Sequence, residues 1–208
     1  MRSLLAFGDS NTWGLIPGSR PQQRFPWDMR WTGILAKGMP GLRVIEEGLC
    51  GRTTVFEDGL RPDRRGLSSL PRILESQQPF DAAILMLGTN DCKSIYEATT
   101  HMIGRGIELC LDELEKYVAP SRILLISPLE LGDEVFKPDK DPEFSLHSID
   151  VSKGLRDEYL EISRKRGTAF LAASDIVRPS NVDDEHLDAN GHKIFAEAVL
   201  IKLREMGV

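Results

Sequence analysis

Short apolar runs alternate with longer stretches of helical periodicity along most of the chain. The apolar runs are typical of buried strands, and they cover residues 2–7, 42–46, 82–87, 122–127 and 168–171. The stretches between them carry apolar side chains three or four positions apart, which predicts helices over residues 29–39, 67–77, 103–118, 149–166 and 187–206. This alternation predicts an α/β fold, a three-layer α/β/α sandwich whose five strands form a mostly parallel sheet.

One segment, residues 128–147, interrupts the alternation. It contains three prolines and many acidic residues, so we expect it to be irregular. It leaves the fourth predicted strand at the carboxyl end, where open α/β sheets bind ligands, and is therefore expected to help wall the active site. Its apolar side chains are sparse, which favours their burial against another subunit over a mobile surface loop or a lid within one subunit. They are Leu129, Leu131, Val135, Phe136 and Phe144.

Length and composition favour an ordinary globular protein. The 208 residues suit a single domain, residues 1–208, with 41% hydrophobic and 28% charged residues. The net charge of −6 is mild and the charges are interspersed, so neither a nucleic acid nor a membrane is an expected partner. The first apolar run is too short for a signal peptide, which predicts a cytoplasmic protein. The three cysteines lack CxxC spacing, which favours reduced thiols over disulfides or a zinc site: Cys50, Cys92 and Cys110.

Three of the predicted strands run into loops in which a glycine lies next to polar groups. The first runs into Gly8-Asp9-Ser10-Asn11, and the next two run into residues 48–52 and 88–91. Because parallel strands end at one edge of the sheet, these loops are expected to meet there. Ser10 would then be a nucleophile, provided that a base, a group that orients the base and oxyanion donors lie close to it. The alternative is that Ser10 merely caps the following helix.

His186 is the best candidate for that base among the four histidines. It lies in the loop before the last predicted helix, and Asp183 lies three residues upstream. Asp183 can accept a hydrogen bond from one imidazole nitrogen while the other takes the proton of Ser10. His101 and His147 are expected at the surface, and His192 is expected to pack or cap the final helix.

Four blocks resemble, in order and spacing, those of the GDSL, or SGNH, serine hydrolases. They are Gly8-Asp9-Ser10, then Gly51, then Gly88-Thr89-Asn90-Asp91, and finally Asp183 with His186. Residues 28–33, 46–54 and 86–91 are similar to blocks of the small bacterial arylesterases and acyltransferases in that family. The resemblance covers residues 7–192 and implies a flavodoxin-like fold, ester hydrolysis without a metal or organic cofactor, and homo-oligomers.

The resemblance also implies a role for each matched residue. Ser10 matches the nucleophile, His186 the general base and Asp183 its orienting acid. The backbone N–H groups of Ser10 and Gly51, with the side-chain amide of Asn90, match the oxyanion hole. The chain departs from the family's name at Asn11, where a leucine is usual, and the cluster of residues 183–185 offers other carboxylates for His186. Trp13 is either a wall of the substrate pocket or a core residue.

Two other classes of protein would use the same residues differently. A divalent-metal phosphoesterase would bind its ion with Asp9, Asp91, Asp183 and His186, but it would not explain Gly51 and Asn90 at strand ends. A non-catalytic binding module would have no need of every catalytic group.

For an ester hydrolase, short acyl esters of aryl or simple alcohols are the first expectation, by hydrolysis or by acyl transfer. Carbohydrate acetyl esters are second and lysophospholipids third, because no apolar membrane-binding stretch is evident.

Overall fold

A five-stranded parallel sheet forms the centre of the molecule, in the order β2-β1-β3-β4-β5. The computed structural model describes residues 2–208. The strands are β1 (Arg2–Gly8), β2 (Leu42–Gly48), β3 (Ala82–Met86), β4 (Ile123–Ser127) and β5 (Ala169–Ala172). The predicted parallel sheet is therefore confirmed, with each strand end within two residues of its predicted place.

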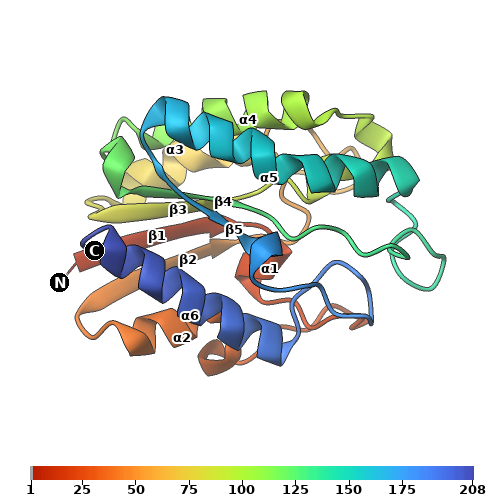
Figure 1. Cartoon of the computed structure of the whole chain (residues 1–208), viewed down its shortest axis with the longest axis horizontal. Helices are drawn as coiled ribbons and strands as arrows, with labels where there is room; N and C mark the ends of the chain where they lie inside the picture. Colours follow the sequence, from red (N-terminus) through yellow and green to blue (C-terminus); the bar gives the residue numbers. More distant parts are fainter. Residues whose placement is uncertain (1) are drawn as a thin grey trace.

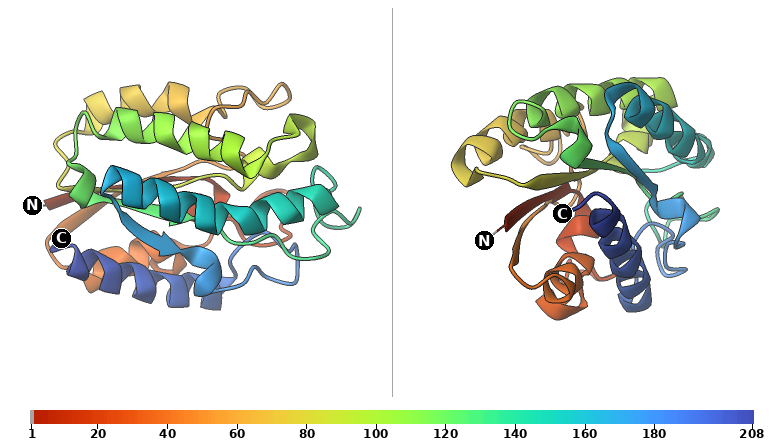
Figure 2. Two further views of the ribbon diagram at one scale, coloured as in Figure 1. Left: turned by 45° about the horizontal axis from the view of Figure 1, so that its top comes forward. Right: turned by 60° about the vertical axis from the view of Figure 1, so that its left-hand side comes forward.

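Helices cover both faces of the sheet, which confirms the predicted sandwich. Helices α3, α4 and α5 lie on one face, and α2 and α6 lie on the other (Figures 1 and 2). The α-helices are α1 (Ser10–Trp13), α2 (Trp31–Gly38), α3 (Gly66–Gln77), α4 (Thr100–Leu114), α5 (Leu146–Arg166) and α6 (Ala189–Glu205). Single 3₁₀ turns occur at η1 (Trp27–Met29), η2 (Asn90–Cys92), η3 (Ser94–Tyr96), η4 (Pro120–Arg122) and η5 (Ala173–Asp175).

Strand β1 is central because both of its faces are apolar. Leu5 and Phe7 belong to the core under α3, α4 and α5, whereas Leu4 and Ala6 belong to the core under α2 and α6. Successive side chains of a strand point to opposite faces, so an unbroken apolar run is what a strand buried on both sides requires.

The turn after β1 forms a helix, α1, that the apolar pattern does not reveal. Asp9 caps it by accepting a hydrogen bond from the Asn11 N–H at 3.0 Å, and Ser10 is its first residue. The backbone of α1 packs directly on the end of β2, where a Cβ added to Gly48 would lie 2.2 Å from the Trp13 nitrogen. Four residues are too few for helical periodicity, so only the capping residues signal this turn.

Residues 128–147 are irregular up to the start of α5, as predicted, but their apolar side chains are buried in the chain's own core. Leu131, Val135 and Phe144 are each at most 3% exposed in the cluster under α4 and α5. The inference that these residues need another subunit for burial is therefore wrong. Whether the chain forms homo-oligomers stays a separate prediction.

Within residues 2–208, no helix is both long and apolar enough to cross a membrane. The start of β1 and the C-terminal end of the chain lie at the amino ends of the strands, on the opposite side of the molecule from α1 (Figure 1).

The close contact at Gly48 predicts that Gly48→Ala destabilises the fold. An added methyl group would push α1 away from β2, and overpacking of this kind costs roughly 1–3 kcal/mol of unfolding free energy. Chemical denaturation measures it. Gly59→Ala is the matched control, because its Cβ would meet nothing within 4 Å, and it should change the free energy by less than about 0.5 kcal/mol. Equal stability of the two variants would contradict the packing described.

Candidate active site

Ser10, His186 and Asp183 form one continuous hydrogen-bonded relay. The Ser10 hydroxyl lies 2.8 Å from His186 Nε2, and His186 Nδ1 lies 2.9 Å from Asp183 Oδ2. Ser10 begins α1 at the carboxyl end of β1, and the other two residues lie in the loop before α6. The sheet thus brings together the three residues that the sequence predicted, in the geometry by which a histidine takes a proton from a serine.

Asp183 is held ionised by several donors. Besides the imidazole, the backbone N–H groups of Gly18, Glu185 and His186 donate to its carboxylate at 3.0, 3.2 and 3.0 Å. Burial alone would raise the pKa of Asp183, but the hydrogen bonds and charge of His186, together with the backbone donors, hold it below its ordinary value. The aspartate is therefore charged and holds a proton on His186 Nδ1, so in the neutral imidazole Nε2 is the nitrogen that accepts the Ser10 hydroxyl.

Asn11 joins the nucleophile's turn to the histidine's loop. Its side-chain oxygen accepts a hydrogen bond from the Leu187 N–H at 2.9 Å, and its amide donates to the Glu185 carbonyl at 3.3 Å. The departure from leucine at this position thus has a structural reason. The buried Asn11 braces the loop on both sides of His186.

The acid cluster of residues 183–185 divides into three separate roles. Asp183 alone is within hydrogen-bond distance of the imidazole. Asp184 faces away, 2.8 Å from Lys140 Nζ, and also accepts the Glu134 N–H at 3.0 Å, so it anchors the segment 128–147. The Glu185 carboxylate lies 3.6 Å from His186 Nδ1. Of the three carboxylates, Asp183 is the one hydrogen-bonded to the imidazole.

The predicted oxyanion donors lie around the same cavity as Ser10. Gly51 and Asn90 both line it, and Gly51 adopts a φ of +81°, which favours glycine. The Asn90 amide donates one hydrogen bond to the Arg52 carbonyl at 3.1 Å, and within residues 2–208 no acceptor is found for its second N–H. These are neutral donors suited to a developing negative oxygen.

Asp91 ties the two oxyanion loops together. It accepts the Thr54 N–H at 2.9 Å and also the Thr54 hydroxyl, so the loop with Gly51 is fixed to the turn with Asn90. Burial raises the pKa of Asp91 to about 6. The motif of residues 88–91 does not by itself distinguish a structural role of Asp91 from ligand binding.

The cavity above Ser10 is small and polar. Its volume is about 50 Å³, and its remaining lining residues are Leu15, Gln22, Cys50, Arg61, Lys93, Asp141, Glu185 and His186. Asp141 comes from the segment 128–147, as expected for a wall of the site. Charged residues such as Arg61 and Lys93 were missed by sequence reasoning because no local pattern distinguishes them from surface charges.

Trp13 does not line this cavity. The Trp13 side chain is half-buried. Its ring packs against the Arg24 guanidinium, whose central carbon lies 5.2 Å from the ring centroid. Leu15 is the apolar residue from this stretch that lines the cavity.

The other three histidines lie outside the relay. His101 and His147 are exposed, as expected. His192 is buried, accepts the Trp31 N–H at 3.3 Å on Nδ1 and has its pKa lowered to about 4 by burial, which fits a packing role.

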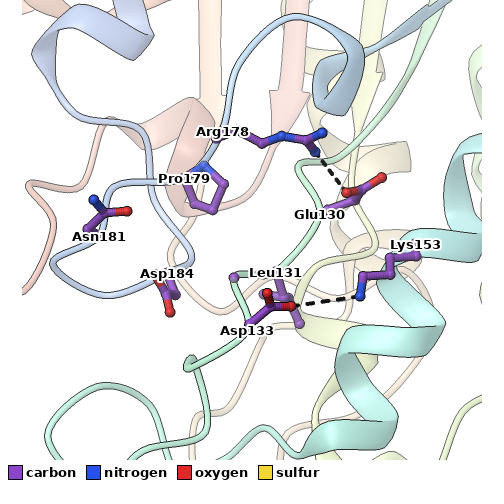
Figure 3. Close-up of a pocket in the computed structure, with 9 residues that line it drawn as sticks. Glu130, Leu131, Asp133, Lys153, Arg178, Pro179, Asn181 and Asp184 are labelled. Atoms are coloured by element: carbon purple, nitrogen blue, oxygen red, sulfur yellow. Dashed lines mark hydrogen bonds and ion pairs between the residues drawn. The ribbon is translucent and has the colours of Figure 1, made fainter.

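A larger cavity, of about 330 Å³, lies on the side of the loop to which Asp184 points (Figure 3). Its charges pair with one another, Arg178 with Glu130 at 2.8 Å and Lys153 with Asp133 at 3.8 Å. Neither Ser10 nor His186 lines it. It is therefore separate from the catalytic cavity.

The described residues do not form the metal site that the phosphoesterase alternative requires. Within residues 2–208, no group of three or more His, Cys, Asp and Glu side chains is placed to hold a metal ion. Asp91 is bonded to Thr54 and Asp183 to His186, so these carboxylates do not converge on one point.

Comparison with known proteins agrees with this geometry. The family model of the GDSL-like lipase/acylhydrolase family matches residues 6–194. The chain belongs to this family. A sequence search among curated proteins finds no match.

Solved structures of the family share the whole fold. Est24, a carbohydrate acetylesterase from Sinorhizobium meliloti, is 33% identical, with a TM-score of 0.91 and coverage of 99% of this chain and 100% of that one. The aryl esterase of M. smegmatis is 30% identical, with the same TM-score and the same coverage. Another carbohydrate acetylesterase family member from S. meliloti is 29% identical, with a TM-score of 0.89 and full coverage of both chains. These similarities support ester hydrolysis as the activity.

The relay predicts that Asp183→Asn slows the labelling of Ser10 by a serine-directed phosphonate. The amide cannot hold the imidazole in the required tautomer, so the labelling rate should fall by roughly 10²- to 10⁴-fold. Intact-mass spectrometry follows the reaction. Asp184→Asn is the matched control; it should label at nearly the normal rate while unfolding at a lower temperature, because the ion pair with Lys140 is lost. A slower rate in the control than in Asp183→Asn would reverse the assignment.

Proposed function

We propose that the chain is a serine esterase that hydrolyses short-chain acyl esters of aryl or simple alcohols through an acyl-enzyme. The observation that carries this proposal is the continuous relay from Asp183 through His186 to Ser10, which opens on a small cavity containing Gly51 and Asn90. A binding module without catalysis would have no use for a buried, fully oriented relay.

In the first half of the reaction, His186 Nε2 takes the proton as Ser10 Oγ attacks the ester carbonyl. The oxygen of the tetrahedral intermediate accepts hydrogen bonds from the N–H groups of Ser10 and Gly51 and from the Asn90 amide. The C–O bond to the alcohol then breaks, and the imidazolium returns its proton to the departing alcohol.

In the second half, a water molecule gives a proton to His186 and attacks the acyl group on Ser10. Collapse of the second intermediate releases the carboxylic acid and restores the Ser10 hydroxyl. An alcohol in place of water would give a new ester, which is the acyl transfer that we propose as a secondary activity.

The size of the cavity favours a short acyl group. Its volume of about 50 Å³ is far below the roughly 300–1,000 Å³ of pockets that hold drug-sized ligands. An acetyl group suits this space, whereas a long acyl chain would require the lining residues to move.

The character of the lining favours a second candidate substrate, an acetylated carbohydrate. Gln22, Arg61, Lys93 and Asp141 offer hydrogen-bond donors and acceptors to an alcohol rich in hydroxyl groups. The similarity to structures described as carbohydrate acetylesterases supports this candidate as well.

A substrate panel tests the proposal: phenyl acetate, phenyl octanoate and an acetylated sugar. We expect kcat/KM for the octanoate to be at least about tenfold below that for the acetate, because methylenes that a pocket does not fit cost 1–3 kcal/mol or more. A kcat/KM for the acetylated sugar above that for phenyl acetate selects the carbohydrate candidate. Highest activity on the octanoate would contradict the short-acyl proposal, and Ser10→Ala is the blank for all three substrates.

A second prediction concerns the oxyanion. Asn90→Ala should lower kcat by roughly 10²- to 10³-fold with little change in KM, because its amide binds the oxygen only as charge develops. Steady-state kinetics on the acetate separate the two constants. If KM rises and kcat is unchanged, Asn90 binds the substrate rather than the transition state.

A further inference from the structure

The Glu185 side chain is a buried carboxylate that the mechanism above does not use. It is part of the cavity wall and its side chain is 6% exposed. Its backbone is fixed, because its N–H donates to Asp183 and its carbonyl accepts from Asn11. Among residues 2–208, no hydrogen-bond partner is found for its carboxylate oxygens. Burial raises the pKa of the Glu185 carboxyl to about 7, so above that pH it places a negative charge on the cavity wall, and a neighbouring positive charge stabilises it.

The nearest group that can supply a positive charge is the catalytic imidazole. Glu185 Oε2 lies 3.6 Å from His186 Nδ1, whose single proton already goes to Asp183 at 2.9 Å. At 3.6 Å the carboxylate acts on the ring through its charge and not as a second hydrogen-bond acceptor. Lys93, the nearest permanent cation on the cavity wall, is paired with Glu143.

The other charges around the ring come from several elements. Asp9, in the turn between β1 and α1, and Asp183, on the same loop as His186, also favour the protonated ring. The charge of Asp141 raises the pKa of Glu185, and that of Lys93 lowers it. The charge of Arg52 lowers the pKa of Asp9. From α6, His192 faces His186 and has a lowered pKa, so it stays neutral.

We propose that Glu185 is a positioning residue that stabilises the protonated form of His186 by its charge and thereby shifts ester hydrolysis toward alkaline pH. The proposal rests on the proposed function, in which neutral His186 is the base. Burial alone would lower the pKa of His186, but Glu185 first and then Asp183 and Asp9 raise it. Since only the neutral ring can accept the Ser10 proton, a raised pKa moves the onset of activity to higher pH.

The test is Glu185→Gln, which keeps the shape of the side chain and removes its charge. We expect the acid limb of the pH profile of kcat/KM to move to lower pH by about one unit or more. At pH values below the midpoint, the fraction of His186 that is neutral is then about tenfold higher in the variant. An unchanged midpoint of the acid limb would overturn the proposal. If KM also rises, Glu185 binds the substrate instead.

A direct titration separates this proposal from the proposed function. The His186 ring signal is followed by NMR against pH in Ser10→Ala and in Ser10→Ala/Glu185→Gln, where no turnover is needed. The midpoint should be lower in the double variant. Asp184→Asn in the same background is the matched control and should titrate like Ser10→Ala, because Asp184 faces Lys140. Equal midpoints with and without Glu185 would refute the proposal even if the protein hydrolyses esters.

Loss of folding in Glu185→Gln would be recognised by its unfolding temperature. Glu185→Leu then replaces it, since an apolar side chain of similar length suits a buried position. The same downward shift of the His186 midpoint is expected, and its absence overturns the proposal.

Discussion

The contact between Ser10 and His186 joins residues 176 positions apart, and the geometry of the site depends on it. It forms because β1 lies inside a parallel sheet whose strands all end at one edge, so the turn after β1 and the loop before α6 meet there. Asn11 then fixes the distance between them by bonding to the backbone on both sides of His186. Ser10, at the first turn of α1, and His186, in a loop held by these hydrogen bonds, are therefore preorganised relative to each other.

Burial makes the charges around this contact effective. Asp183, Glu185 and the imidazole are all shielded from solvent, so their interactions are much stronger than between exposed groups. Asp184 would add a further negative charge, but its ion pair with Lys140 neutralises it and at the same time holds the segment 128–147 against the loop. The three adjacent acidic residues therefore make three different contacts: Asp183 is hydrogen-bonded to the imidazole, Asp184 is paired with Lys140, and Glu185 lies 3.6 Å from His186 Nδ1.

The apolar pattern predicted the sheet and the long helices, whereas the relay was predicted from the polar residues at strand ends and from the resemblance to the serine hydrolases. Consecutive apolar residues such as those of β1 mark a strand buried on both faces, and turn residues at its end mark the site. Helix α1 could not be predicted in this way because it is a single turn, and no local pattern indicates that Trp13, at its end, is half-buried outside the small cavity at Ser10. Similarly, Leu131, Val135 and Phe144 are buried in the core under α4 and α5, a long-range contact that no pattern within their own segment reveals.

The central claim is that ester hydrolysis passes through an acyl group on Ser10. Mixing the protein with p-nitrophenyl acetate, quenching with acid before steady state and measuring the intact mass tests it most directly. The account predicts a mass increase of one acetyl group that peptide mapping places on Ser10, and its loss together with turnover in Ser10→Ala. Acetate release that persists at the normal rate in Ser10→Ala, or an acetyl group on another residue such as Cys50, would contradict it.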